Sequence, residues 1–193
     1  MKGSSISMKN KIQLQEVWSI PNILCYIRIL LIPLFVWRYI TASIPLDYDL
    51  AAAIIVLSGL TDFLDGFIAR KFNQITELGK LIDPIADKLT QAAIAFVLVI
   101  RFEWMSLLLF VFIIKEMTMG IVCLILYREG KKLDGALWYG KLTTAVFYFT
   151  MIVLIAVPSL NLFMANTLII LTTFMLIFAF FMYMSIFMRM KRR

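Results

Sequence analysis

Residues 58–89 read SGLTDFLDGFIARKFNQITELGKLIDPIADKL and place four aspartates in an otherwise apolar sequence. The acids form two close pairs within 26 residues, Asp62 with Asp65 and Asp83 with Asp87. An Asp at the centre of a membrane helix costs about 2.5–3.5 kcal/mol, so four of them need a compensating partner. Spacings of three and four residues put each pair on one helix face, so two facing helices can gather all four carboxylates. The pattern therefore predicts a metal site.

The rest of the chain has the composition of an integral membrane protein. Of its 193 residues, 62% are hydrophobic and 16% are charged, which is too apolar for a soluble domain of this size. A bilayer-spanning helix needs about 20 apolar residues, and six segments qualify: 20–42, 49–70, 79–101, 105–127, 136–157 and 161–187. We predict an all-α membrane bundle of six transmembrane helices in a single domain, residues 1–193, preceded by a short N-terminal interfacial amphipathic helix.

The basic residues predict how this bundle is oriented. The net charge of +7 collects before the first span, after the second and fourth spans, and in the C-terminal MRMKRR. By the positive-inside rule, both termini and the aspartate pairs lie on the cytoplasmic side of the cell membrane. Basic tails beside spans meet anionic lipid headgroups more often than nucleic acid, so we expect membrane lipids and no nucleic acid as partners.

The residue types around the aspartates restrict the chemistry. The chain has no histidine, which excludes a Ser-His-Asp triad and His-ligated zinc. Carboxylate oxygens suit Mg²⁺, Mn²⁺ or Ca²⁺, and four carboxylates can hold two such ions. Arg70 offers a fork for phosphate oxygens, and an aspartate beside the metals is the natural general base. This combination predicts metal-assisted transfer of a phosphorus-containing group.

The motif resembles the signature of the CDP-alcohol phosphotransferase family, Asp-x-x-Asp-Gly-x-x-Ala-Arg, eight residues, then Gly-x-x-x-Asp-x-x-x-Asp. Residues 62–87 match it at every fixed position, and SIPNILCYIRILLIPLF, residues 19–35, resembles the family's first span. The resemblance implies six transmembrane helices, a homodimer and a polar cavity open to the cytoplasm. It also implies these roles: metal ligation by Asp62, Asp65 and Asp83, with help from Asp87 as the catalytic base, and binding of the CDP moiety at Asp62, Gly66, Ala69, Arg70 and Gly79.

The reaction implied is attack by an alcohol on CDP-diacylglycerol with release of CMP, assisted by two Mg²⁺ or Mn²⁺ ions. The chain resembles the branch of phosphatidylglycerophosphate synthases and CDP-alcohol-type cardiolipin synthases. We expect glycerol 3-phosphate as the acceptor, with phosphatidylglycerol as the alternative, because Cys123 stands where the first group typically carries an Arg. Arg28, Lys115 and Lys141 are the candidate acceptor contacts, and Arg28 is alternatively the partner of a buried acid.

The sequence also bears on two residues of the first span, Asn22 and Cys25, and on a rival function. Asn22 either caps the first helix or contacts substrate, and Cys25 is expected to be an inert packing residue. A divalent-cation transporter is a rival function because acids inside a membrane also mark ion pathways. The acids here are confined to one side of the bilayer, which disfavours a continuous pathway.

Overall fold

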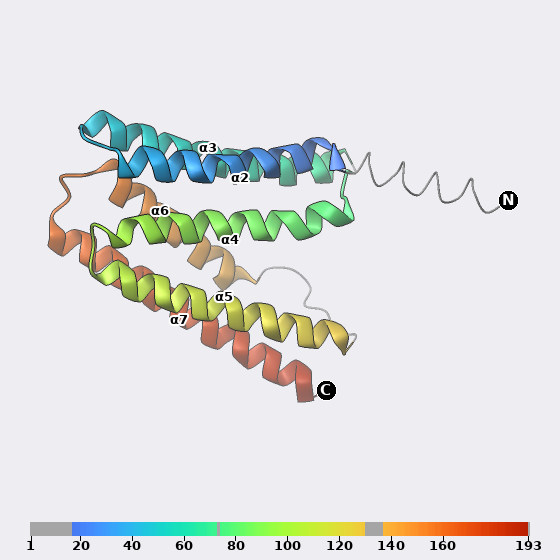
Figure 1. The fold of residues 1–193 in the computed structure, drawn as a ribbon. Coiled ribbons are helices and arrows are strands. Elements are labelled where there is room, and N and C mark those ends of the chain that lie inside the picture. The colour runs from blue at the N-terminus through green and yellow to red at the C-terminus, as the bar shows by residue number, and fades with distance from the viewer. Residues whose placement is uncertain (1–16, 73, 130–136, 193) are drawn as a thin grey trace. The chain divides into compact units, whose positions relative to one another are not determined.

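A computed structural model describes residues 17–72, 74–129 and 137–192, and the regular secondary structure of this part of the chain is all helical. Its six helices are α2 (Ile20–Ile40), α3 (Pro45–Lys71), α4 (Glu77–Val99), α5 (Trp104–Arg128), α6 (Trp138–Ala156) and α7 (Leu162–Arg192) (Figure 1). The all-α prediction is therefore confirmed. The predicted N-terminal amphipathic helix lies outside the described residues.

Five of these helices are long and apolar enough to cross a membrane, namely α2, α3, α5, α6 and α7. The protein is accordingly a multi-pass membrane protein. The remaining predicted span, residues 79–101, corresponds to α4, which does not meet the same standard. Its first half carries Asp83, Asp87 and Lys88, and each charge makes a bilayer environment less favourable. The prediction of six spans is confirmed for five helices only.

The helix ends differ from the predicted spans for local reasons. Helix α3 begins at Pro45, four residues before the predicted span, because proline suits a first helical turn and Asp47 accepts hydrogen bonds from the backbone N–H groups of Ser43 and Ile44, at 2.8 and 3.2 Å. Asp47 also pairs with Arg38 of α2 at 2.8 Å. These contacts fix the conformation of the short connection between α2 and α3.

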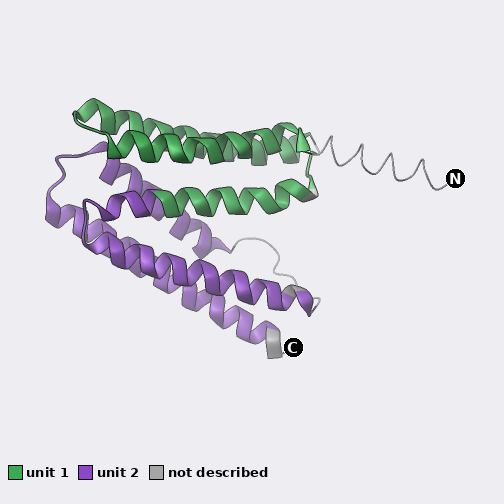
Figure 2. Ribbon diagram, in the orientation of Figure 1, with its two compact units in different colours: residues 1–93 green, residues 94–193 purple. Residues whose placement is uncertain are grey.

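The chain divides into two compact units, Met1–Ala93 and Ile94–Arg193 (Figure 2). In the first unit α2 and α3 pack against each other along their lengths (Figure 1). The small residues Ala51 and Ala52 are buried on α3, and such residues allow helix backbones to approach closely in membranes. Phe35 of α2 and Ile55 of α3 line one narrow internal void.

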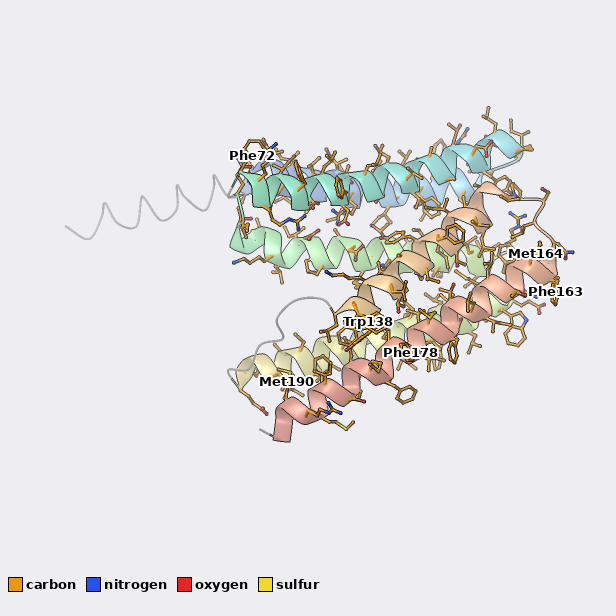
Figure 3. The ribbon with its side chains drawn as sticks, turned by 180° about the vertical axis from the view of Figure 1, so that it is seen from behind. Phe72, Trp138, Phe163, Met164, Phe178 and Met190 are labelled. Carbon is orange, nitrogen blue, oxygen red and sulfur yellow. The ribbon has the colours of Figure 1, made fainter. Side chains whose placement is uncertain are left out.

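The second unit is built on α7, which packs against both α5 and α6. Gly140 of α6 marks the closest approach, because a Cβ atom there would lie 2.2 Å from the Tyr183 hydroxyl oxygen. Thr150 and Thr172 share a buried hydrogen bond of 2.8 Å between α6 and α7. On the outside, Phe163 is 77% exposed (Figure 3). Large exposed apolar side chains of this kind indicate a lipid-facing surface.

Candidate active site

The four motif aspartates lie on two helices of the first unit, on either side of the α3–α4 connection. Asp62 and Asp65 are in the second half of α3, and Asp83 and Asp87 are in the first half of α4. Their spacing places each pair on one helix face. Glycine or alanine residues accompany each pair, with Gly66 and Ala69 on α3 and Gly79 and Ala86 on α4.

Three of the four carboxylates meet at one guanidinium group. Arg28 of α2 pairs through Nη1 with Asp62 at 2.8 Å and with Asp83 at 3.0 Å, and its Nη2 pairs with Asp65. The Arg28 side chain is only 1% exposed. The structure thus joins α2, α3 and α4 through one buried cation, which is the second of the two roles that the sequence left open for Arg28.

The three acids around Arg28 differ in how much of each side chain is exposed. The Asp65 side chain is 4% exposed, whereas those of Asp62 and Asp83 are 49% and 45% exposed. One guanidinium against three carboxylates leaves a formal charge of +1 − 3 = −2. Hard oxygen donors with this surplus charge, two of them accessible from outside, fit a divalent cation of the Mg²⁺ or Mn²⁺ type.

Asp87 lies one helical turn beyond Asp83 on α4 and is partly buried. Its charge acts on Asp62 of α3 along with that of Asp83. Asp87 therefore belongs to the same electrostatic cluster as the acids that contact Arg28. Its roles as metal ligand and base stay predictions.

Cys25 also belongs to this cluster, although the sequence suggested an inert packing residue. Its thiol donates to Asp65 at 3.4 Å and makes a longer contact of 3.9 Å with Asp83. The sulfur and one oxygen of each of these aspartates lie within 4.8 Å of one another. A signal for this placement existed, because Cys25 precedes Arg28 by three residues and so shares its helix face.

A pocket of about 130 Å³ opens beside the acids in the first unit. Five motif residues line it, namely Asp65, Gly66, Ala69, Gly79 and Asp83. The other lining residues are Pro21, Asn22, Cys25, Gln74, Ile75, Thr76 and Lys80. The structure thus brings the small residues predicted to admit the CDP moiety to the edge of the acidic cluster.

Asn22, Thr76 and Gly79 form one wall of this pocket. The Thr76 hydroxyl accepts the backbone N–H of Gly79 at 2.9 Å, as a helix N-cap does, and donates to the Asn22 side-chain oxygen at 3.1 Å. Asn22 therefore does not cap α2, whose N-cap is Ser19. A Cβ atom at Gly79 would lie 2.6 Å from the Asn22 oxygen, so this position requires glycine.

Gly66 and Arg70 lie one turn apart on α3. A Cβ atom at Gly66 would lie 3.6 Å from both terminal nitrogens of Arg70, which is ordinary van der Waals contact. The protein alone therefore leaves room for alanine at position 66. Arg70 is exposed in the last turn of α3 and does not itself line the pocket.

The remaining predicted acceptor contacts, Lys115 and Lys141, belong to the second unit. Lys115 of α5 pairs with its neighbour Glu116, while Lys141 is exposed in the first turn of α6. Cys123 is exposed on α5. Their part in acceptor binding stays a prediction.

Comparison with known proteins assigns the chain to a family. The CDP-alcohol phosphatidyltransferase family matches residues 18–185, a range that includes the acidic cluster, the pocket and the second unit's helices up to the C-terminal part of α7. The motif on α3 and α4 predicted this match.

Individual relatives carry two kinds of name. A protein named CMP-forming cardiolipin synthase from Streptomyces coelicolor is 41% identical over 42% of this chain. A CDP-diacylglycerol--glycerol-3-phosphate 3-phosphatidyltransferase from Rickettsia bellii is 48% identical over 37% of this chain. These two matches cover 39% of each relative's own length. A protein of the latter name from Aquifex aeolicus is 32% identical over 80% of this chain and 83% of its own length. The chain belongs to the CDP-alcohol phosphatidyltransferase family.

Proposed function

We propose that this protein transfers the phosphatidyl group of CDP-diacylglycerol to an alcohol and releases CMP. The observation that carries the proposal is the meeting of Asp62, Asp65 and Asp83 at one buried point beside the pocket lined by Gly66 and Gly79. Family membership over most of the chain supports the same activity. It also supports one functional domain that spans both compact units.

The proposed step balances as a substitution at phosphorus. The hydroxyl oxygen of the acceptor forms a bond to the phosphorus that carries the diacylglycerol, and the bond from that phosphorus to the bridging oxygen breaks. CMP leaves with the bridging oxygen. The proton of the hydroxyl passes to the carboxylate of Asp87, since the chain has no histidine to take it.

The residues proposed to hold two Mg²⁺ or Mn²⁺ ions are Asp62, Asp65, Asp83 and Asp87. Bound divalent cations would neutralise charge on the pyrophosphate and stabilise the attacking and leaving oxygens. Asp65 is almost fully buried, which suits a ligand of fixed position. Asp62 and Asp83 are about half exposed, which gives the donor phosphates access to the same site.

The pocket beside the acids is the proposed site of the CDP moiety. Gly79 and Ala69 carry little or no side chain and so leave room in the pocket for a ligand. Arg70 can provide a bidentate contact to a phosphate. The Asn22 amide and the Thr76 hydroxyl add polar groups beside Gly79. Gly66 is compatible with alanine in the protein alone, so we propose that the ligand is what requires glycine there.

We propose glycerol 3-phosphate as the acceptor, giving phosphatidylglycerol phosphate. Relatives with this activity in their names include the one from Aquifex aeolicus that aligns over 80% of the chain. Phosphatidylglycerol is the second candidate, because the Streptomyces coelicolor relative is named a cardiolipin synthase. Lys141 and Lys115 are the proposed contacts to the acceptor phosphate, together with Arg28 once it is not held by the acids.

The proposed setting is a homodimer in the cell membrane, with both termini and the active site on the cytoplasmic side. The basic residues after α3, after α5 and at the end of α7 support this orientation. This orientation is tested by fusing to residue 193 a reporter that fluoresces only in the cytoplasm. A fusion that is expressed but does not fluoresce would place the C-terminus on the other side of the membrane.

The activity is tested by CMP release from CDP-diacylglycerol by the purified protein with Mg²⁺ or Mn²⁺. Glycerol 3-phosphate and phosphatidylglycerol are offered separately, and the lipid product is identified by mass spectrometry. We expect CMP and phosphatidylglycerol phosphate with the first acceptor. Cardiolipin formed only with the second would change the acceptor, whereas no CMP with any alcohol would reject the enzyme. Mn²⁺ uptake into protein-containing liposomes would then favour a transporter.

A further inference from the structure

We propose that Arg28 is an internal counter-cation, which gathers Asp62, Asp65 and Asp83 in the metal-free protein and competes with the divalent cation for them. The inference deepens the proposed metal site and rests on that part of the proposed function. Arg28 acts here as a positioning residue, because its contacts are with carboxylates and not with reacting atoms.

The first support is the way in which the guanidinium is shared. Nη1 contacts Asp62 of α3 and Asp83 of α4 at 2.8 and 3.0 Å, and Nη2 contacts Asp65. Without a cation between them, carboxylates drawn from two helices would repel one another in a partly buried place. The fork of Arg28 can hold three acids at once, which the point charge of a lysine cannot do equally well.

The second support is the incomplete satisfaction of Arg28. Its side chain is 1% exposed, and its Nε–H has no hydrogen-bond acceptor among the described residues. Buried donors are normally paired, so this arginine is not in a fully satisfied hydrogen-bond network. It is held by ion pairs and charge-assisted hydrogen bonds to the acids, and a cation of higher charge can replace it there.

The third support is that both cations would need the same oxygens. The oxygens that Arg28 contacts belong to the acids proposed as metal ligands, and the cluster keeps a formal charge of −2 with Arg28 in place. This surplus attracts a divalent cation, but the guanidinium, about 3 Å from the same oxygens, repels it. Removing that positive charge should therefore tighten metal binding.

The test compares the wild-type protein with Arg28→Gln by titration with Mn²⁺, followed by electron paramagnetic resonance of the free ion. We expect Arg28→Gln to bind Mn²⁺ at least tenfold more tightly. Thermal unfolding without metal should begin at a lower temperature in this variant, and added Mn²⁺ should raise its unfolding temperature more than that of the wild type. A purely structural role would lower the midpoint and weaken metal binding together.

Arg38→Gln is the matched control, since it removes one positive charge from the same helix. Arg38 lies ten residues further along α2, about 15 Å away by helical rise, and pairs with Asp47 instead of the cluster. Its Mn²⁺ affinity should equal that of the wild type. A change as large as that of Arg28→Gln would show a general charge effect and overturn the inference.

If Arg28→Gln does not fold, Arg28→Lys provides the same test with the charge retained and the fork removed. We expect a smaller increase in Mn²⁺ affinity, about threefold, because an ammonium group bridges the acids less well. If the folded variants bind Mn²⁺ as tightly as the wild type or more weakly, the inference is overturned. It is also overturned if neither the variants nor the wild type bind Mn²⁺. CMP release by the wild type is measured separately, so failure of this inference is distinguishable from failure of the proposed activity.

Discussion

The two units of this membrane protein bury different kinds of polar group. The first unit buries charges, with Arg28 and Asp65 both almost inaccessible, and it also buries the amides of Asn22 and Gln91. In the second unit, the buried residues with a polar group, among those described, all carry hydroxyls: Thr143, Thr150, Thr172, Thr173, Tyr139 and Tyr183.

The threonines of the second unit are easily satisfied. The hydroxyls of Thr143, Thr172 and Thr173 each donate to the carbonyl oxygen four residues earlier in their own helix. Buried charges have no such local solution and need partners from other helices. We therefore predict that the acid-dependent chemistry belongs to the first unit and that the buried hydroxyls of the second unit mainly support packing. Substitutions in the first unit should then reduce activity more than stability, and those in the second the reverse.

The strongest test of this contrast is Asp87→Asn in the first unit. An amide of similar size cannot accept the proton of the acceptor hydroxyl, so CMP release should fall by about 10²–10⁴-fold. Binding of CDP-diacylglycerol, measured by equilibrium dialysis, should remain. Asp49→Asn is the matched control, because Asp49 is an exposed acid in the first part of α3. Turnover at the wild-type rate would remove the base assignment of Asp87.

A smaller effect is expected for Gly79→Ala at the pocket wall. The new Cβ atom would lie 2.6 Å from the Asn22 oxygen and 2.8 Å from the Thr76 oxygen. Overpacking of this kind costs about 1–3 kcal/mol. If that cost falls on the bound state, CDP-diacylglycerol should bind about 5- to 150-fold more weakly. Gly59→Ala on α3 is the control, since nothing lies within 4 Å of its Cβ position. If both variants bound CDP-diacylglycerol equally well, Gly79 would not belong to the donor site.

Gly140→Ala tests the second unit, where stability and not activity should change. Its Cβ atom would lie 2.2 Å from the buried Tyr183 hydroxyl, and displacement of that ring costs about 1–3 kcal/mol. The midpoint of thermal unfolding in detergent should fall by about 2–4 °C per kcal/mol. Gly120→Ala on α5 has open space at its Cβ position and should unfold like the wild type. A midpoint unchanged by Gly140→Ala would contradict the close α6–α7 contact.

The smallest effect is expected for Thr150→Val. The variant loses the 2.8 Å hydrogen bond to Thr172, and such bonds between membrane helices contribute about 0.6 kcal/mol on average. Thermal unfolding should shift by about 1–2 °C, with CMP release per folded molecule unchanged. A loss of activity without loss of stability would give this unit a direct part in the chemistry and break the contrast between the units.

Most of the helical architecture was predictable because it depends on local properties. Long apolar runs set the ends of every described helix to within five residues, as hydrophobic length does in a bilayer. Two of the differences have local causes. Asp47 stabilises an earlier start of α3, and α4, capped by Thr76, begins two residues before the predicted span. The spacing of the aspartates likewise places each pair on one helix face without knowledge of the fold.

The sequence by itself therefore determined an all-helical membrane protein with two acidic helix faces and a family signature. Only the tertiary structure decided what those faces meet. Arg28 and Asp83 are separated by 55 positions in the chain, and Cys25 and Asp65 by 40. Such contacts depend on the rotation and register of α2 against α3 and on the placement of α4, and no local sequence pattern specifies these. Hydrophobic length constrains where a helix lies in the chain, but it does not specify which side chains of another helix it contacts.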